Sequence, residues 1–344
     1  MKSNSLFIGV LALLAVVGAV WYFGGGTEAP APRAESTMAE LPISYSAVSH
    51  LANELGYYTE EGVTMTVTSV PAGPDVVASL RSPSGAGLGT IAVTPVVTLI
   101  GASENPIVLA TTLTSNEQVQ LITFVKTGIT EDPKTLRGKK IGRVRNTVGE
   151  IYLSRLLEKG GLKDTDVTLV DGRPADLMNL LVKGDIDAAA LWDPFVPQAK
   201  RNYEEQLAKK AVSDRGATTV FVDTSLYTLA FNMVTTKEKF DANKAAIEGT
   251  LRALIKTEDY IKKNPAEAQT KLEAWLNLKP GDLDHFMQTT NFNVELNVPQ
   301  MKQWLADELA WLRGVQDVKD TRTDMAPFID ASFLKNIDRS RVTD

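Results

Sequence analysis

The sequence predicts an α/β protein built from two lobes. From Ala39 onward, short β-like runs alternate with amphipathic helices, which is the pattern of mainly parallel sheets covered by helices. The chain has 344 residues, more than one compact core of typical size contains. After the second unit, two further β-runs lead the chain back toward the first. We therefore expect two lobes with two mainly parallel sheets, joined by two hinge strands near 119–125 and 218–222.

The first lobe is expected at residues 39–125 and again at 223–344. Apolar residues alternate with threonine over 63–70, which predicts a half-buried strand. The Gly-, Ser- and Pro-rich stretch 82–89 predicts a flexible loop, and Pro95 predicts a helix that begins directly after a buried strand. The expected strands are 41–45, 63–70, 91–93, 107–112 and 119–125, and the expected helices are 49–56, 76–81 and one from 95.

The second lobe is expected at residues 126–222 and repeats this order. Its strands are expected at 139–144, 167–170 and 186–191, and its helices at 147–159, 174–183 and 194–210. The β-runs 218–222 and 226–235 then return the chain to the first lobe. The remainder predicts helices at 237–263, 265–276, 280–290 and 299–313, followed by a tail at 322–344 that packs only in part.

The N-terminus predicts export. Leu6–Phe23 is an unbroken apolar run of 18 residues, which suits either a signal peptide or a signal anchor at 1–23. Ala29-Pro30-Ala31 has the small-x-small form of a cleavage site, but Pro32 follows and disfavours cleavage, so we favour a retained anchor. Residues 24–38 then form a flexible linker. The bulk of the chain is expected in the periplasm or at the outer face of the inner membrane.

Composition excludes several kinds of protein. The net charge is -6 and basic residues are distributed along the chain, so no nucleic-acid partner is expected. There is no cysteine, which excludes disulfides and a lipid-modified cysteine anchor. The two histidines, His50 and His285, stand far apart, so neither a metal site nor a bound cofactor is expected. No Gly-x-Ser-x-Gly elbow occurs, and we expect a protein that is not an enzyme.

The most informative stretch is the end of the strand at 186–191. Small residues at 188–190 precede Trp192, Asp193 and Pro194, and ligands of open α/β sheets bind at the carboxyl ends of strands. Trp192 and Asp193 are therefore candidate ligand-binding residues. The alternative is that the alanines serve close helix packing and Trp192 is a core residue.

Further candidates stand at other strand-to-helix junctions. Asn146 and Thr147 open a helix whose free N–H groups suit a carboxylate, sulfonate or phosphate, although one of them can simply cap that helix. Ser46, Ser49 and Thr94 follow strands of the first lobe, where hydroxyls bind ligands or cap helices.

Four segments in this order resemble one family of binding proteins. They are 55–63 (LGYYTEEGV), 136–142 (LRGKKIG), 156–162 (LLEKGGL) and 184–194 (GDIDAAALWDP). Together they are similar to the solute-binding proteins of the nitrate, sulfonate and taurine group of ABC importers, which have the type II periplasmic binding protein fold. The resemblance covers about residues 41–268.

The resemblance implies a monomer that clamps a small-molecule ligand between its lobes and docks on ABC permease and ATPase subunits at the inner membrane. Carried onto matching positions, it implies ligand contacts at Ser46, Ser49, Thr94, Asn146, Thr147, Trp192 and Asp193. The resemblance also leaves two alternative functions open. One is a ligand sensor that reports to a membrane receptor, and the other is a thiamine-pyrimidine precursor enzyme of similar fold, for which His50 is the histidine nearest a junction.

Glu150 departs from the pattern of sulfonate binders. A carboxylate that faces the cleft disfavours an anionic ligand through like-charge repulsion. An amine, an amphoteric molecule or an aromatic heterocycle therefore stays open beside sulfonate and nitrate.

Overall fold

A computed structural model describes residues 33–344, and Ala34–Asp344 forms one compact unit. Its first sheet has five strands in the order β2-β1-β3-β10-β4. Strands β2, β1 and β3 run parallel, and β10 pairs antiparallel with both β3 and β4, so β10 alone is reversed. The strands are β1 (Ala34–Glu40), β2 (Val63–Ser69), β3 (Leu88–Ala92), β4 (Pro106–Ser115) and β10 (Leu229–Thr236).

The second sheet repeats this plan, with the order β7-β6-β8-β5-β9. Here β5 alone is reversed, because it pairs antiparallel with β8 and β9 while β7, β6 and β8 run parallel. The strands are β5 (Val119–Phe124), β6 (Lys140–Arg143), β7 (Thr168–Asp171), β8 (Ala188–Trp192) and β9 (Thr218–Phe221). The two sheets confirm the expected two-lobed α/β fold.

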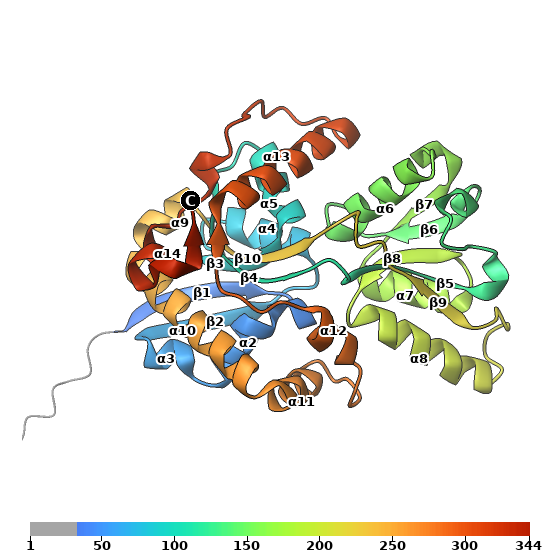
Figure 1. Ribbon diagram of the computed structural model, residues 1–344, viewed down its shortest axis with the longest axis horizontal. Helices are drawn as coiled ribbons and strands as arrows, with labels where there is room; N and C mark the ends of the chain where they lie inside the picture. Colours follow the sequence, from blue (N-terminus) through green and yellow to red (C-terminus); the bar gives the residue numbers. More distant parts are fainter. Residues whose placement is uncertain (1–32) are drawn as a thin grey trace, which may run out of the picture. The chain divides into compact units, whose positions relative to one another are not determined.

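Helices cover both faces of each sheet (Figure 1). On the second lobe, α6 lies on one face and α7 and α8 on the other. On the first lobe, α4, α5 and α13 lie on the face opposite α2 and α10. The helices are α2 (Ala47–Glu54), α3 (Tyr57–Glu60), α4 (Gly73–Arg81), α5 (Val93–Gly101), α6 (Val148–Lys159), α7 (Pro174–Lys183), α8 (Phe195–Ala208), α9 (Lys237–Ala242), α10 (Lys244–Lys263), α11 (Pro265–Trp275), α12 (Asp284–Thr289), α13 (Val298–Val315) and α14 (Ser332–Ile337).

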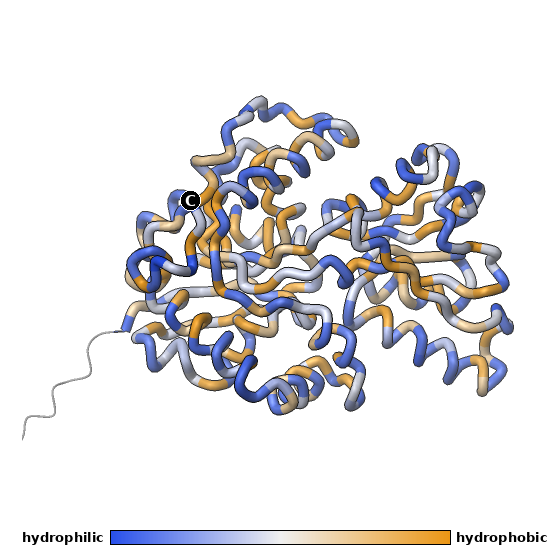
Figure 2. The backbone as a smooth tube through the Cα atoms, viewed as in Figure 1, coloured by the Kyte–Doolittle hydropathy of each residue, from blue (hydrophilic) through white to orange (hydrophobic). Residues whose placement is uncertain are grey.

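Local sequence explains these elements. In α10, residues such as Ile247, Leu251, Leu254 and Ile261 are buried at helical spacing, which gives the helix one apolar face. Helix α7 begins with Pro174, whose fixed backbone suits a first turn, and ends at Gly184, which adopts φ 89°. Figure 2 shows the same pattern as hydrophobic strands inside and hydrophilic stretches on the outer helices.

Small residues on β6, β8 and α6 permit close layer packing. A Cβ atom on Gly149 of α6 would lie 2.9 Å from the Ala190 carbonyl oxygen and 3.2 Å from Cζ3 of Trp192. A Cβ atom on Gly142 would lie 2.8 Å from the Ile186 side chain. The alanines of β8 therefore do serve helix-on-sheet contact, which leaves Trp192 as the first large side chain at the strand end.

The first strand differs from the expectation. The strand predicted at 41–45 is wrong, because β1 pairs with β2 along its whole length, from Ala34↔Val63 to Glu40↔Ser69. The last five residues of the linker expected at 24–38 thus belong to a sheet. The sequence analysis missed these residues because they are mostly polar. In this part of β1 only alternate positions are buried, so the strand does not need a continuous apolar run. Residues 1–32, including the expected anchor at 1–23, lie outside the described residues.

The crossings between the lobes also differ. Strand β5, placed by the sequence analysis at the end of the first lobe, lies in the second sheet. The chain therefore crosses at 116–118, between β4 and β5, and returns at 222–228, between β9 and β10. The segments 119–125 and 218–222, expected as the crossing strands themselves, are paired with each other in the second lobe.

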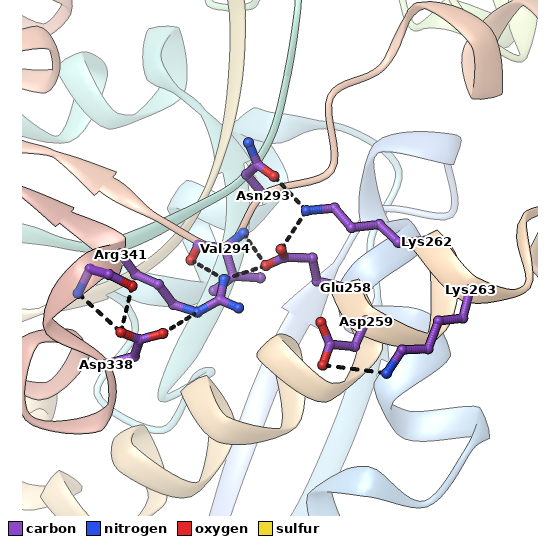
Figure 3. A network of polar contacts seen from close by, with 9 residues as sticks. Glu258, Asp259, Lys262, Lys263, Asn293, Val294, Asp338 and Arg341 are labelled. Atoms are coloured by element: carbon purple, nitrogen blue, oxygen red, sulfur yellow. Dashed lines mark hydrogen bonds and ion pairs between the residues drawn. The ribbon is translucent and has the colours of Figure 1, made fainter.

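The C-terminal tail is packed, contrary to the expectation for 322–344. Its Met325, Phe328, Leu334 and Val342 side chains are buried. Arg341 Nη1 donates 2.6 Å to Glu258 Oε2 of α10 and 3.0 Å to the Val294 carbonyl oxygen (Figure 3). Further short elements in the chain are η1 (Ser44–Ser46), η2 (Val125–Thr127), η3 (Pro133–Leu136), η4 (Asp164–Asp166), η5 (Ala326–Phe328), η6 (Arg339–Arg341), β11 (Leu296–Asn297) and β12 (Val342–Thr343).

Across residues 33–344, no helix has the length and apolar character needed to cross a membrane.

Candidate ligand site between the lobes

Trp192 ends strand β8 with its ring almost completely enclosed. The side chain is 5% exposed, and its Nε1 atom has no hydrogen-bond partner among the described residues. An indole N–H is a donor only, and buried donors are nearly always paired. The indole N–H is therefore available to donate a hydrogen bond to a bound ligand.

Helix α6 begins beside Trp192 without a side-chain cap. Thr147 occupies the N-cap position, but its Oγ1 donates 2.7 Å back to the Val144 carbonyl oxygen. The first N–H groups of a helix have no intrahelical acceptor, and they carry the positive end of the helix dipole. This end of α6 thus provides further donors next to the Trp192 indole.

A cavity of about 30 Å³ lies between the lobes at this point. The second lobe contributes Thr147, Val148 and Trp192, and the first lobe contributes apolar walls that include Tyr45 and Phe231. Because a water molecule occupies about 30 Å³ in the liquid, this space holds one or two waters. A larger ligand requires the lobes to separate and close again around it. The remaining lining residues are Leu41, Ile43, Gly73, Ala92 and Pro95.

Polar contacts join the lobes around this cavity. Ser44 Oγ donates 3.1 Å to the Asp193 carbonyl oxygen, and the Asp193 carboxylate lies 3.2 Å from His285 Nδ1 of α12. Burial raises the pKa of Asp193, and the hydrogen bond from His285 opposes that rise. The same hydrogen bond raises the pKa of His285. Asp193 is therefore engaged in holding the lobes together.

The predicted site residues separate into two groups. Thr147 and Trp192 line the cavity, and Thr94 precedes its lining residue Pro95 in the chain but has its hydroxyl beside Tyr227 and Glu308. The hydroxyls of Thr94 and Ser46 are buried without a hydrogen-bond partner among the residues described. These four positions stay candidates for ligand contact.

The other three predicted residues have partners within the protein. Ser49 Oγ donates 2.5 Å to Glu40 Oε1, and Asn146 Oδ1 accepts a 2.5 Å hydrogen bond from Gln316 Nε2. Asp193 pairs with His285 as described. Asn146 and Asp193 follow the ends of β6 and β8 and have partners from distant parts of the chain, whereas Ser49 lies within α2 and its partner Glu40 is nine residues away.

Glu150 does not line the cavity. Its Oε2 accepts a 2.6 Å hydrogen bond from the Asn146 backbone N–H, and its Oε1 lies 3.2 Å from Arg143 Nη1. The concern that this carboxylate repels an anion is therefore removed, because an arginine and the backbone N–H compensate its charge.

Two other features do not join this site. His50 stacks on Trp275 with ring centroids 3.6 Å apart and lies 3.5 Å from Glu40 Oε2, so it is a packed side chain. A larger cavity of about 540 Å³ is lined by Ser36, Thr64 and Gly87 among others. These residues stand at the amino ends of β1, β2 and β3, opposite the strand ends where ligands of such sheets bind. No group of three metal-ligating side chains is found within 33–344.

A family model described as "NMT1/THI5 like" matches residues 44–268. The chain belongs to the NMT1/THI5-like family. Among curated relatives, it is 25% identical over 193 residues to a Brucella abortus (strain 2308) protein named as a binding protein, covering 53% of this chain and 54% of that protein. The chain thus spans about half the length of the Brucella relatives it matches.

A second relative has an enzyme's name. The chain is 26% identical over 251 residues to the 4-amino-5-hydroxymethyl-2-methylpyrimidine phosphate synthase THI12 of Saccharomyces cerevisiae, covering 70% of this chain and 69% of that protein. The relatives of this chain thus include one named as a binding protein and one named as an enzyme.

Solved structures share the fold of this NMT1/THI5-like chain. The alkanesulfonate-binding protein SsuA of Xanthomonas axonopodis pv. citri bound to MOPS has a TM-score of 0.69 at 16% identity, covering 88% of this chain and all (100%) of that chain. The periplasmic nitrate-binding protein NrtA of Synechocystis PCC 6803 has a TM-score of 0.69 at 14% identity, covering 90% and 89%. These similarities confirm the type II periplasmic binding protein fold.

Sequence reasoning missed several residues of this NMT1/THI5-like site. Tyr45 and Phe231 form its apolar walls, yet each stood in a run that predicts only a buried strand. His285 stood in a helix with no signal of its own, and it reaches the site because α12 lies beside the end of β8. Only the fold brings these segments together.

Proposed function

We propose that the protein is an extracytoplasmic solute-binding protein that delivers a small polar solute to an ABC importer. The observation that carries this proposal is the pair of unused donors in the cavity between the lobes: the buried Trp192 N–H and the uncapped start of α6. Binding that contacts both lobes shifts the population toward the closed arrangement, which a permease then recognises.

The solute carries a hydrogen-bond-accepting, anionic head on an apolar body. The donors at α6 and Trp192 favour an anion such as a sulfonate, a carboxylate or nitrate. The walls formed by Tyr45, Pro95 and Phe231 favour an apolar or aromatic body. The names of the fold relatives, an alkanesulfonate binder and a nitrate binder, support this class. An anionic heterocycle fits the same description, and taurine fits its anionic head.

Location and partners follow from the same proposal. An apolar run at Leu6–Phe23 suits export and, if retained, attachment to the inner membrane. The protein then acts as a monomer in the periplasm, and its partners are a permease and an ATPase of the importer. Neighbouring permease and ATPase genes support transport, and their absence supports a sensor that reports to a membrane receptor.

Calorimetric titration tests the proposal. The protein spanning residues 33–344 is titrated with alkanesulfonates, taurine, nitrate and carboxylates, with X-ray scattering before and after addition. A bound anion should decrease the radius of gyration as the lobes close. If none of these solutes binds, or if a bound solute leaves the scattering unchanged, the proposal is wrong.

The rival is an enzyme of pyrimidine synthesis, which the relation to the yeast synthase favours. Its expected histidine, His50, is stacked on Trp275 and does not line the cavity between the lobes. Incubation with pyridoxal phosphate separates the two functions, because formation of a pyrimidine product supports the synthase and its absence supports the solute-binding protein.

A further inference from the structure

A second cavity, of about 200 Å³, opens where the chain returns from the second lobe to the first. Its walls are α6, the crossing segment 222–228 and α13 (Figure 1). It has no lining residue in common with the Trp192 cavity. Helix α13 also lies outside residues 44–268, which the family model matches. We call it the crossing cavity; its lining includes Arg155, Tyr227, Trp304, Asp307 and Glu308.

Glu308 is the central feature of the crossing cavity. It stands on the buried face of α13 between Leu305 and Leu309 and is 3% exposed. Burial raises the pKa of this carboxyl group, and the Thr94 and Tyr227 hydroxyls beside it lower that pKa through hydrogen bonds. Neither hydroxyl nor Glu308 Oε2, however, has a partner of good geometry among the described residues. Burying a carboxyl group with an unused oxygen lowers the stability of the fold, so a residue that binds a ligand is one explanation for its presence here.

Arg155 supplies a positive charge at the same cavity. Its Nη1 donates 2.8 Å to the Leu226 carbonyl oxygen, and its guanidinium carbon lies 5.8 Å from the Tyr227 ring centroid. No carboxylate in the described part of the chain lies within ion-pair distance of this guanidinium, so most of its five N–H groups are available. The cavity therefore has an unpaired guanidinium at one wall.

The opposite wall is acidic. Asp307 joins Glu308 there, and its Oδ1 accepts a 2.8 Å hydrogen bond from Gln303 Nε2. The Trp304 ring adds an apolar surface between the charged ends. By the volume that a water occupies in the liquid, about 30 Å³, the cavity has room for roughly six non-hydrogen atoms or more.

We propose that the crossing cavity is a binding site for a small zwitterion, an amino acid or an amino sulfonate. Its ammonium group lies between Glu308 and Asp307, where carboxylate oxygens accept charge-assisted hydrogen bonds. Its anionic group lies against the Arg155 guanidinium, and its short carbon chain lies on Trp304. Because Arg155 belongs to the second lobe and Glu308 to the first, the bound zwitterion connects the two lobes beside the crossing segment.

Calorimetry with purified protein spanning residues 33–344 tests this site. The probes are glycine, alanine, 4-aminobutyrate and aminomethanesulfonate, and the matched single-charge controls are acetate and methylamine. A zwitterion should bind, and each single-charge control should bind at least about tenfold more weakly, because it makes one of the two charge-assisted contacts. Failure of all four zwitterions to bind at millimolar concentration overturns the proposal.

Variants locate the bound zwitterion. Glu308→Gln keeps the shape of the side chain, and Arg155→Lys keeps its charge while losing the planar fork. Arg155→Met removes the charge. Glu308→Gln and Arg155→Met should each weaken binding by about tenfold or more, and Arg155→Lys should weaken it less. Glu131→Gln and Arg137→Met are matched changes at exposed positions and should leave the affinity unchanged.

Two outcomes would overturn the proposal even if a zwitterion binds. One is an affinity that neither Glu308→Gln nor Arg155→Met lowers, with both variants folded by circular dichroism. The other is a loss of zwitterion binding in Trp192→Phe together with full binding in Arg155→Met, which assigns the zwitterion to the Trp192 cavity. That second result leaves the proposed solute-binding function intact, so the two proposals fail separately.

Discussion

His285 Nδ1 lies 3.2 Å from the Asp193 carboxylate, and the two residues come from opposite lobes. His285 is 42% exposed and Asp193 2% exposed, while Glu117 Oε2 lies 3.8 Å from the other ring nitrogen. Protonation of the imidazole therefore places a positive charge between two carboxylates that belong to different parts of the fold. We therefore expect this contact to make lobe closure sensitive to pH.

The pH dependence has a definite sign. The hydrogen bond to Asp193 raises the pKa of His285 above its ordinary value of 6.5, so the pair is strongest below that value and is lost as pH rises through the raised pKa. The raised pKa of Asp193 sets the acidic limit, where the carboxylate becomes neutral. Scattering from about pH 9 down to about pH 6 should show a decreasing radius of gyration, and His285→Gln should remove the trend. An equal trend in that variant would contradict the assignment.

Trp192→Phe should weaken anion binding and lower stability only by the packing lost with the smaller ring. The substitution keeps an aromatic ring but removes the indole N–H, which has no partner among residues 33–344. Loss of one hydrogen bond to a charged ligand reduces affinity by about tenfold or more. Calorimetry gives the affinity, and urea unfolding gives the stability. We expect Trp192→Ala combined with Thr147→Ala to abolish the ligand-induced thermal shift. Full binding in both variants would place the ligand elsewhere.

Gly149→Ala should disrupt the same site through packing. An added Cβ atom meets the Ala190 backbone oxygen at 2.9 Å and Trp192 Cζ3 at 3.2 Å, so α6 must move away from β8. The displaced helix start should lower ligand affinity, and the strain should cost about 1 to 3 kcal/mol of stability. Gly314→Ala in α13, where an added Cβ atom meets nothing within 4 Å, is the matched control. Equal effects of the two changes would contradict this account.

Glu308→Gln should become relatively more stable as pH rises. Burial raises the pKa of Glu308 from 4.5 to about 7, so the native state holds this proton more tightly than the unfolded chain. As pH rises from about 4.5 to about 7, the unmodified protein therefore loses about 3 kcal/mol of its free energy of unfolding, and the variant does not. Arg155, Tyr227 and Asp307 also face this carboxyl group and are unchanged in the variant. Urea unfolding at about pH 4 and pH 8 measures the difference, and a constant difference would be inconsistent with a buried titrating carboxyl group.

Arg341→Met should destabilise the first lobe. Glu258, whose side chain is 5% exposed, loses the 2.6 Å contact to Arg341 and keeps those from the Val294 N–H and Lys262 (Figure 3). Removing one partner of a buried ion pair costs about 3 to 5 kcal/mol, and the remaining contacts favour the lower end. Glu258→Gln combined with Arg341→Met should recover part of this loss, because no buried charge is left. Urea unfolding of both variants checks the order, and a double variant less stable than the single one would refute it.

Much of the fold followed from local patterns. Alternation over 63–70 predicted β2, and proline and glycine positions predicted the bounds of α7 within a residue. For the candidate site, the sequence predicted only those residues that stand directly at the end of a strand or the start of a helix. Trp192 and Thr147 were found because they stand where β8 ends and α6 begins. The contacts of Glu150 with Arg143 and with the Asn146 backbone N–H could not be read from the sequence, because they form only in the fold.

The sequence by itself determined the α/β class, the order of the elements and the two residues at the centre of the candidate site. These depend on hydrophobic periodicity and turn residues, which act between near neighbours in the chain. Only the tertiary structure decided that β5 belongs to the second sheet, that Asp193 pairs with His285, and that Arg155 and Glu308 line one cavity. Each of these depends on contacts between distant segments, and such contacts exist only once the two crossings have placed the sheets.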